Sequence, residues 1–448
     1  MTDTFVVIGG DAAGMSAASK AKRQHPELDV IVFEKGDWVS YAACGMPYYV
    51  KGAVDDLDDL VTITADEFRD ERDVDLRTGA EVVDIDPEAQ TVTVDNGTET
   101  YEQSYDDLLV ATGASAIKPP FEGLDLEGVF TIHDMDEADA IEDYVTDGDL
   151  ETAAIVGGGY VGVEMAEALS EHGLDVSLYE MLPHVLQPFG EPVAEAVEDH
   201  LREQGVDLHL ETAVSGFDGD ERVERVELEE ETVPADVVIV GVGVAPNADL
   251  AEAAGLELGP TGAVATDEYG RTNDENVFAA GDCAEARHVV TGEPDHVPLA
   301  LTANRAGRAI GQTITGDPTP TGEIAGTAIV KAFELGAART GIVDEERARE
   351  AGFDPVSVTI SAATRAHYYP DGEELTVTLL ADRGSEIVLG GSIVGREGAK
   401  RIDTVATALH AGMTVTELQN ADLAYAPPFS PVWDPVLTAA KVLSGKLE

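Results

Sequence analysis

The chain has 448 residues, and its 88 Asp and Glu side chains outnumber 27 Lys and Arg to give a formal net charge of −61. Such a surface repels nucleic acids and anionic membranes, so both are excluded as partners. Hydrophobic residues make up 44% of the chain and alternate with the acids in regular runs, which excludes an acidic disordered protein.

The charge excess is typical of the solvated acidic surface of a halophilic protein, which repels itself at low salt. Residues 1–4 lead directly into an apolar strand, without the basic segment of a signal peptide. No run approaches the ~18 apolar residues that span a bilayer. The two cysteines, Cys44 and Cys283, are too distant in sequence for a disulfide framework. We therefore expect a soluble cytoplasmic protein of about two to four domains.

The chain opens with a strand, a glycine-rich turn, a helix and a second strand, which is the order of a dinucleotide-binding unit. These segments are Thr4–Ile8, residues 9–14 (GGDAAG), a helix to about Gln24, and Val30–Phe33. Small turn residues let the backbone approach a pyrophosphate at the helix N-terminus. The second strand ends in an acid, where ribose hydroxyls bind, although Asp11 replaces the middle glycine of GxGxxG. The predicted cofactor-binding positions are Gly9, Gly10, Ala13, Gly14, Glu34 and Lys35.

A second unit fits GxGxxG fully, between the strands Ala153–Val156 and Val176–Tyr179. A glycine-rich turn of an ordinary α/β protein is the alternative, but the acid 23 residues on favours nucleotide binding. An acid at this position binds a 2′-hydroxyl and repels a 2′-phosphate, so NADH is favoured over NADPH. The predicted binding positions here are Gly157, Gly159, Tyr160, Gly162 and Glu180.

Two dinucleotide units predict two dinucleotides, one flavin and one nicotinamide. Two further strand–turn segments, residues 107–114 and 276–282, flank the second unit. This order implies a flavin domain in two pieces, 1–115 and 244–322, with a nicotinamide domain at 116–243 inserted. Asp282 is suited to accept a hydrogen bond from the ribityl chain of a flavin. The further cofactor-binding positions are Thr112, Gly113, Gly243, Gly281, Asp282 and Ala300.

The composition changes after residues 316–320. From residue 325, four β-like runs precede two helices at about 398–411 and 434–445, which predicts a separate α+β domain at 323–448. The predicted fold class is α/β, with two Rossmann-like domains and this C-terminal domain. No metal site is predicted.

Cys44 lies in SYAACGMPYY, residues 40–49, soon after the first βαβ unit. A buried free cysteine is usually inert packing. Its placement after a flavin-type unit and before Gly-Met-Pro instead predicts a redox-active thiol. A helix beginning near Cys44, together with a polarising flavin, would favour the thiolate. Cys283, in Gly-Asp-Cys, is interpreted as a structural residue.

The order of these segments resembles the flavoprotein pyridine nucleotide–disulfide oxidoreductases over essentially the whole chain. The lone cysteine motif is most similar to the coenzyme A–disulfide reductases. This resemblance implies FAD, NADH, a homodimer, and an active site completed by the partner's C-terminal domain, which becomes a dimerisation domain. Two-cysteine relatives have a second cysteine where Tyr49 stands, so Cys44 is expected to cycle between the thiolate and either a mixed disulfide or a sulfenic acid. The similarity to coenzyme A–disulfide reductases implies a mixed disulfide with coenzyme A.

The resemblance also implies which tyrosines lie near that mixed disulfide. Residues 423–431 (LAYAPPFSP) and 367–370 (HYYP) are similar to the reductase pattern. Tyr425 and Tyr368 are the predicted catalytic pair, with Tyr369 as the alternative to Tyr368. Core packing with a satisfied hydroxyl is the ordinary role of a tyrosine, but the proline-rich flank argues against it for Tyr425.

Coenzyme A is anionic, so an acidic protein has to supply local cations. Ser16, Lys20 and Arg23 have the spacing of one helix face. A solvated face is the alternative to phosphate binding by this cluster. Two departures from the family affect contacts with coenzyme A: Ala43 replaces an asparagine, and Trp433 stands where a basic residue often occurs. Arg72 matches a basic position of the family, and Ser40 and Asn304 match positions that contact the substrate. The resemblance therefore implies that these three residues also bind the substrate.

Three other functions stay open. Oxidase and peroxidase relatives carry a histidine where this chain has Ala12, which disfavours peroxide cleavage. A coenzyme A persulfide or polysulfide reductase would use the same cysteine and flavin. A non-catalytic flavin-binding sensor is the alternative outside enzymes.

Overall fold

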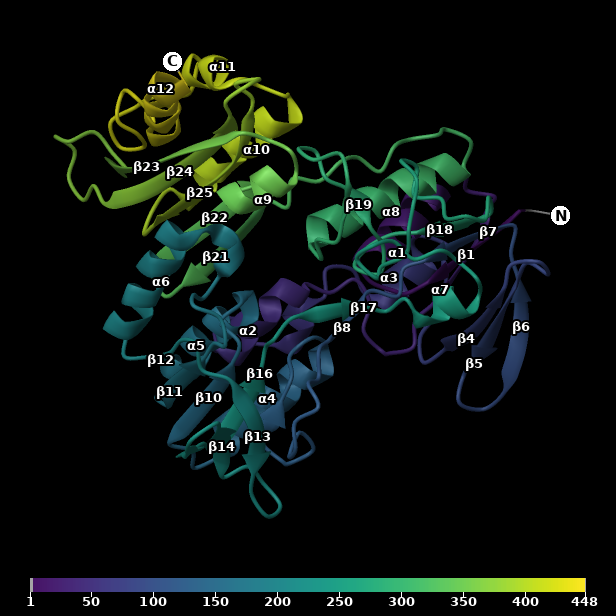
Figure 1. Cartoon of the computed structure of the whole chain (residues 1–448). Helices are drawn as coiled ribbons and strands as arrows, with labels where there is room; N and C mark the ends of the chain where they lie inside the picture. The colour runs from purple at the N-terminus through teal and green to yellow at the C-terminus, as the bar shows by residue number, and fades with distance from the viewer. Residues whose placement is uncertain (1–2, 448) are drawn as a thin grey trace.

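The computed structural model describes residues 3–447, which form three domains (Figure 1). Two contain parallel sheets of the dinucleotide-binding type, and the third is an antiparallel sheet with helices. The predicted fold class is thus confirmed. No helix in residues 3–447 has the length and apolar character needed to cross a membrane.

The N-terminal domain is a five-stranded parallel sheet. In spatial order its strands are β18 (Val277–Ala279), β7 (Asp107–Val110), β1 (Thr4–Ile8), β2 (Asp29–Phe33) and β3 (Asp75–Arg77). The helices are α1 (Ala12–Gln24), α2 (Met46–Val50), α3 (Ala65–Asp70), α7 (Asp249–Ala253) and α8 (Ala300–Ile314). An antiparallel sheet of β4 (Glu81–Asp86), β5 (Thr91–Asp95) and β6 (Thr100–Ser104) lies beside them.

Both faces of strand β1 are buried, because its side chains alternate between two cores. Phe5 and Val7 pack with α1 and α8, whereas Val6 and Ile8 pack with β4, β5 and α7. Burial of both faces explains why β1 is continuously apolar rather than alternating in polarity.

Helices α1 and α8 lie side by side and join the two sequence pieces of this domain. A Cβ on Gly307 would lie 2.0 Å from the carbonyl oxygen of Ala13, and one on Gly311 would lie 2.3 Å from that of Ala17. Only glycine permits so close an approach of two backbones.

The inserted domain has a second five-stranded parallel sheet. Its strands, in spatial order, are β12 (Asp207–His209), β11 (Asp175–Tyr179), β10 (Thr152–Val156), β16 (Val237–Val240) and β9 (Val129–Phe130). Its helices are α4 (Met135–Asp147), α5 (Tyr160–Glu171) and α6 (Glu191–Glu203), and a small sheet holds β13 (Val214–Asp218), β14 (Arg225–Leu228) and β15 (Thr232–Pro234). The chain enters through β8 (Ala114–Ala116) and leaves through β17 (Val244–Pro246), which pair antiparallel.

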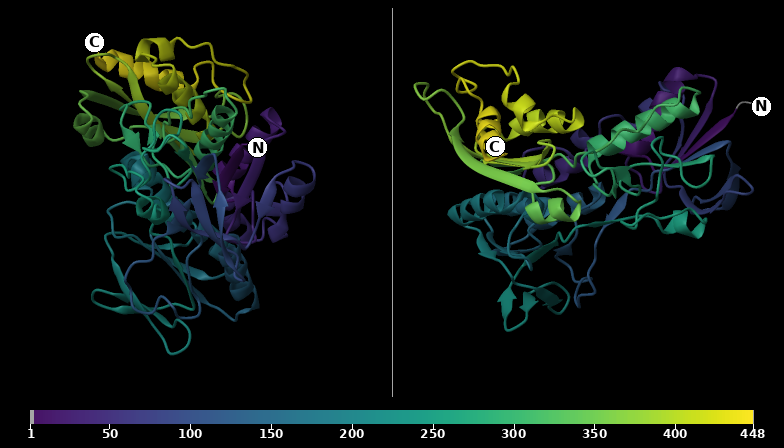
Figure 2. Two further views of the ribbon diagram at one scale, coloured as in Figure 1. Left: turned by 90° about the vertical axis from the view of Figure 1, so that its right-hand side faces the viewer. Right: turned by 45° about the horizontal axis from the view of Figure 1, so that its top comes forward.

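The C-terminal domain is an antiparallel sheet covered by helices (Figure 2). The strands, in spatial order, are β21 (Ala328–Ala332), β22 (Leu335–Gly341), β25 (Val388–Gly395), β24 (Glu374–Asp382) and β23 (Pro355–Ala363). The helices are α9 (Glu345–Glu350), α10 (Ile402–His410), α11 (Val415–Gln419) and α12 (Pro435–Leu447). The sequence predicted four of these strands and missed β22, whose Gly and Ala residues lack the β-branched signal of a strand.

Candidate active site

Both glycine turns close so tightly that their first and last positions need glycine. A Cβ on Gly9 would lie 2.1 Å from a carbonyl oxygen that follows the neighbouring strand, and one on Gly157 would lie 2.5 Å from the equivalent oxygen. Both residues have positive φ, 111° and 106°. The last glycines, Gly14 and Gly162, would bring a Cβ to 2.0 and 1.9 Å from the first glycine's carbonyl. A Cβ on Gly159 would meet no atom within 4 Å, so the middle of the second turn is open to a pyrophosphate.

The acids that follow the second strands occupy equivalent places in the two domains. Glu34 accepts a hydrogen bond of 2.7 Å from the backbone of Gly10, and Glu180 accepts one of 2.6 Å from Gly158. The other oxygen of each carboxylate accepts from the backbone two residues further on. Each carboxylate is therefore held beside its glycine turn, where the ribose of a dinucleotide binds.

Asp11, in place of the middle glycine, is turned toward the segment of Cys44. Its carboxylate accepts a hydrogen bond of 3.1 Å from the backbone of Tyr41. Burial raises the pKa of Asp11 to about 6, and the charges of Glu34 and Asp282 also act to raise it. The departure from GxGxxG thus links the first turn to the cysteine segment.

The cysteine segment turns sharply before it forms a short helix. Ser40 has a φ of 49°, in the left-handed region, and its backbone N–H donates to the carbonyl of Gly10 at 3.0 Å. Cys44 lies in a 3₁₀ turn that leads directly into α2, and it is exposed, whereas Cys283 is fully buried. The turn therefore presents Cys44 beside the first dinucleotide turn, with no second thiol exposed in the described chain.

The protein's own charges act against the thiolate. Partial burial raises the pKa of the Cys44 thiol, and the carboxylates of Glu164, Asp282 and Asp11 raise it further. A backbone hydrogen bond at the turn acts in the opposite direction but is outweighed. Helix α2 begins close to Cys44, as the sequence predicted, whereas burial and these carboxylates act on the thiol pKa in the opposite direction.

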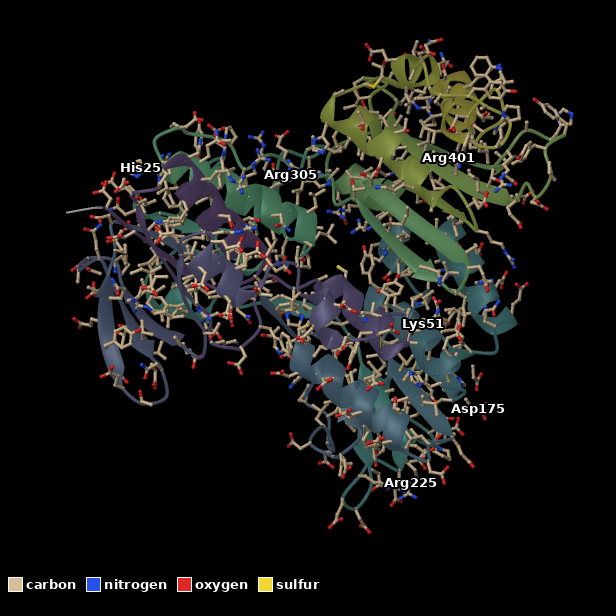
Figure 3. All side chains as sticks on the ribbon, turned by 180° about the vertical axis from the view of Figure 1, so that it is seen from behind. His25, Lys51, Asp175, Arg225, Arg305 and Arg401 are labelled. Carbon is tan, nitrogen blue, oxygen red and sulfur yellow. The ribbon has the colours of Figure 1, made fainter. Side chains whose placement is uncertain are left out.

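Helix α2 is anchored on the inserted domain. Tyr48 donates to Glu164 at 3.0 Å, and Tyr49 donates to Asp139 at 2.9 Å. Immediately after α2, Lys51 forms an ion pair with Glu167 of α5, as does Lys331 of β21 at 2.5 Å. Figure 3 labels Lys51 in the region where the three domains meet. The position of Cys44 is thus fixed by contacts from all three domains.

The residues predicted to bind coenzyme A are partly brought together. Ser16 on α1 donates a hydrogen bond of 2.6 Å to Asn304 on α8, 288 residues away in sequence. Lys20 and Arg23 follow Ser16 on the same face and have no ion-pair partner in residues 3–447. Arg72 lies beside this helix, donating to Ser19 at 3.4 Å, and pairs with Glu67 at 3.0 Å.

The adjacent Lys22 serves the fold instead. It donates to the carbonyls of Pro26 and Leu28 and pairs with Asp73 at 2.6 Å. The sequence has three basic residues between positions 20 and 23, but only Lys20 and Arg23 remain available to a ligand at this helix.

The predicted tyrosines form a pair on the C-terminal domain. The hydroxyls of Tyr368 and Tyr425 are 3.1 Å apart, and the side chains are 64% and 45% exposed. Tyr369 instead lies against the guanidinium of Arg365. The β23–β24 loop, which carries Tyr368, projects away from α2 in Figure 1.

Comparison with known proteins assigns the family. A family model described as pyridine nucleotide-disulphide oxidoreductase matches residues 3–307, and its dimerisation domain matches residues 327–435. The chain belongs to this family. It is an oxidoreductase, as the resemblance predicted, and it carries the family's dimerisation domain.

Several relatives in this family match along their whole length. The chain is 41% identical over 444 residues to a protein of Pyrococcus horikoshii named NAD(P)H coenzyme A polysulfide/persulfide reductase, with 99% of each chain covered. It is 32% identical over 430 residues to coenzyme A disulfide reductase of Staphylococcus aureus, covering 95% of this chain and 96% of the relative. The structure of a NAD-dependent persulfide reductase from A. fulgidus superimposes with a TM-score of 0.96 at 41% identity, covering 99% of this chain and 83% of that chain.

The residues around the first turn fit the flavin of this family. The carboxylate of Asp282 receives no hydrogen bond from residues 3–447, so its oxygens are free to bond a ligand. Burial raises its pKa, and the charges of His296 and His133 act to lower it. Thr112 donates to the carbonyl of Asn247 at 2.7 Å and accepts from its amide at 2.9 Å, which fixes the turn after β7. The remaining predicted positions are placed as follows: Gly113, Gly243 and Gly281 have positive φ, Ala300 begins α8, and Lys35 is exposed.

Sequence reasoning missed several residues at the site of this oxidoreductase. Glu164 and Glu167 lie one turn apart on α5, directly after the GxGxxG turn, and that pair of acids on a mostly buried helix was an available signal. Lys441 lies over the ring of Trp433 at 5.4 Å, so a cation does reach the position where the family often has a basic residue.

Proposed function

We propose that this oxidoreductase uses NADH to reduce coenzyme A disulfide through bound FAD and Cys44. The contact between Ser16 and Asn304 carries the proposal, because it brings two predicted coenzyme A positions from distant parts of the sequence together. Lys20 and Arg23 follow Ser16 along α1 and add cations that form no ion pair within the described chain. In a protein with net charge −61, such cations suit a phosphate ligand.

The reaction divides between two sets of residues. Glu34, Asp282 and the first glycine turn would hold FAD, which when bound carries an electron pair from NADH to a disulfide. Cys44 attacks one sulfur of the disulfide, forms the mixed disulfide and releases one coenzyme A thiol. Reduction of the mixed disulfide then restores Cys44 and releases the second thiol. Cys44 is exposed and Cys283 is buried, so Cys283 is not available to form a disulfide with Cys44. This supports an external thiol as the partner of Cys44.

A substrate panel with the holoenzyme under anaerobic conditions tests this function. NADH oxidation would be compared with coenzyme A disulfide, glutathione disulfide, coenzyme A persulfide, polysulfide, peroxide and oxygen. We expect the highest kcat/KM with coenzyme A disulfide. A preference for oxygen over every sulfur substrate would overturn the proposal.

Coenzyme A persulfide or polysulfide is the second candidate substrate class. The relative named for that activity is 41% identical, whereas the coenzyme A disulfide reductase is 32% identical. Both reactions need a thiolate and residues that bind coenzyme A, so the same residues would serve them. Ala12 and the absence of a peroxidase histidine there make NADH oxidase activity a side reaction.

We infer that the active form is a homodimer in which the partner supplies the tyrosine pair. The hydrogen bond that Tyr425 shares with Tyr368 raises the pKa of Tyr425, so its hydroxyl stays protonated and suits donation to a leaving thiolate. Tyr425→Phe is expected to lower kcat by about 10–100-fold, with little change in KM for NADH. Steady-state kinetics would check this, with Tyr369→Phe as the matched control. An unchanged kcat for Tyr425→Phe would contradict the assignment.

Glu180 supports NADH as the preferred reductant. Its buried carboxylate lies beside the second glycine turn and would face a 2′-phosphate with like charge. We expect kcat/KM with NADH to exceed that with NADPH by about tenfold or more. In Glu180→Gln, this preference for NADH should become smaller, because the repelling charge is removed. Measured ratios for both nucleotides test this, and equal efficiency in the wild type would contradict it.

The acidic surface supports a salt-adapted cytoplasmic enzyme. Because net charge of this size repels itself, added salt screens it and favours the folded state. The melting temperature of the holoenzyme is expected to rise steeply between dilute buffer and molar KCl. Scanning calorimetry over this range tests the expectation, and a flat or falling curve would contradict it.

A further inference from the structure

Two hydrogen bonds determine how helices α1 and α8 lie against each other. Near the start of both helices, Ser16 donates to the side chain of Asn304 at 2.6 Å. At their far ends, Thr315, just after α8, donates to the side chain of Gln24 at 3.1 Å. The helices therefore run parallel, and residues at equal distances beyond Ser16 and Asn304 lie level with each other. We call the line between these two hydrogen bonds the α1–α8 seam.

Each helix presents a cation one turn beyond the first of these hydrogen bonds. Residues four apart share a helix face, so Lys20 follows Ser16 on α1 and Arg308 follows Asn304 on α8. The helical rise places each cation about 6 Å along its helix from the contact of Ser16 with Asn304. Lys20 and Arg308 thus lie on opposite sides of the seam, at the same level.

The fold uses neither of these two cations. Lys20 and Arg308 form no ion pair within residues 3–447, although the chain has 88 acidic residues for only 27 Lys and Arg. Arg308 also forms no hydrogen bond within that range, and it is exposed beside an open hollow of about 280 Å³. The acid that follows α8, Asp317, already accepts a hydrogen bond from Gln312 at 2.6 Å. Both cations are therefore available to an anionic ligand.

The seam starts beside the segment of Cys44. Helix α1 begins directly after Asp11, whose carboxylate accepts a hydrogen bond from the backbone of Tyr41, three residues before Cys44. A ligand whose sulfur lies at Cys44 is thus able to extend past Ser16 along the seam to the two cations.

We propose that Arg308 and Lys20 together bind the phosphates of coenzyme A, and that Arg308 thereby favours coenzyme A disulfide over disulfides without phosphate. A planar guanidinium bonds two phosphate oxygens at once, and the ammonium adds a second positive charge from the other helix. The identity of the ligand as coenzyme A rests on the proposed function. The capacity of the seam to bind phosphate does not.

A comparison of two disulfide substrates in an Arg308→Gln holoenzyme tests the proposal. Pantethine contains the disulfide end of coenzyme A disulfide but none of its phosphates. The KM for coenzyme A disulfide should rise about tenfold with kcat nearly unchanged, because the lost contact is made equally before and during the reaction. The KM for pantethine should stay within about twofold of the wild-type value. A merely structural role of Arg308 would change both KM values alike.

Arg305→Gln is the matched control on the same helix, and Figure 3 labels its position. Its Nη2 donates to the carbonyl of Glu323 at 3.3 Å, so this guanidinium is directed to the segment that follows α8. The variant removes the same charge, and the KM for coenzyme A disulfide should change by no more than about twofold. Arg308→Lys keeps the charge but loses the planar fork, so its KM should lie between those of wild type and Arg308→Gln. One KCl concentration is used throughout, because salt screens these interactions.

Binding of adenosine 3′,5′-bisphosphate gives a second measurement that does not depend on turnover. This nucleotide resembles the phosphate-bearing end of coenzyme A and has no thiol. Titration calorimetry on the holoenzyme should give a Kd about tenfold weaker in Arg308→Gln than in wild type and in Arg305→Gln. An unchanged Kd, or an equal rise in KM for both disulfides, would overturn the proposal. Failure of the proposed function would appear differently, as wild-type protein that binds the bisphosphate through Arg308 but does not reduce coenzyme A disulfide.

Discussion

Replacing Cys44 by serine is expected to abolish NADH-dependent disulfide reduction, with kcat falling by about 10⁴-fold or more. A serine hydroxyl is not ionised near neutral pH and does not form a disulfide, so no mixed disulfide accumulates. Flavin content should stay at the wild-type level, because the first glycine turn, Glu34 and Asp282 are untouched. Rapid-mixing kinetics and the flavin absorbance of the purified variant measure the two properties.

Cys283→Ala is the matched control for the thiol. Cys283 is fully buried, and its sulfur lies 3.5 Å from the carbonyl oxygen of Val110 and 3.4 Å from that of Ala280. Disulfide turnover should be retained in this variant, with a modest loss of stability from the small cavity. Wild-type turnover in Cys44→Ser would remove Cys44 from the mechanism, and loss of turnover in Cys283→Ala with flavin bound would contradict the structural role of Cys283.

The second large effect is expected for Glu167→Gln. Glu167 is 5% exposed in its side chain, pairs with Lys51 and Lys331, and accepts from the backbone of Phe333 at 2.8 Å. Neutralising it leaves two ammonium groups facing each other at a junction of three domains. Breaking a buried ion pair in this way costs about 3–5 kcal/mol of the free energy of unfolding. Urea unfolding in molar KCl, followed by fluorescence and by activity, measures it.

Glu171→Gln is the control on the same helix. Glu171 is 56% exposed, its nearest oxygen is 3.7 Å from Lys51, and an exposed pair of this kind contributes about 0–1 kcal/mol. Equal losses in the two variants would mean that Glu167 does not join the domains.

The contribution of Glu167 also has a defined pH dependence. Burial opposes its ionisation, but the hydrogen bonds and charges of Lys331 and Lys51 outweigh burial and lower its pKa. A lowered carboxyl pKa contributes stability above the ordinary value of 4.5, and this is lost as the pH falls through the lowered value.

The fold was predictable because its signals are local. The two glycine turns, their flanking apolar strands and the acids Glu34 and Glu180 lie within short windows of sequence. Strand β5 (Thr91–Asp95) alternates strictly between polar and apolar residues, which is the pattern of a half-buried strand. The antiparallel sheet of β4, β5 and β6 was therefore predictable, although the sequence analysis did not include it. Strand β22 carried none, because tertiary pairing with β21 and β25 determines it.

The site was predictable only in part, because its electrostatics arise between domains. The motif around Cys44 suggested a thiolate favoured by a helix, whereas Glu164 comes from another domain and acts in the opposite direction. The contact of Ser16 with Asn304 depends on the packing of α1 on α8, which no local pattern specifies. Lys20 and Lys22 look alike in sequence, and only the fold shows that Lys22 is held by Asp73.

The close packing of α1 on α8 has a consequence for the order in which the chain assembles. Strand β18 and helix α8 are synthesised after the whole inserted domain, yet the backbone of α1 at Ala13 and Ala17 packs directly against Gly307 and Gly311 of α8. The inserted domain is continuous in sequence and is able to fold on the ribosome while the strands and helices that precede it wait for their partners. A nascent chain that stops before residue 311 therefore lacks part of the helix that packs on α1. The inserted domain should fold in such a chain before the N-terminal domain is able to retain a flavin.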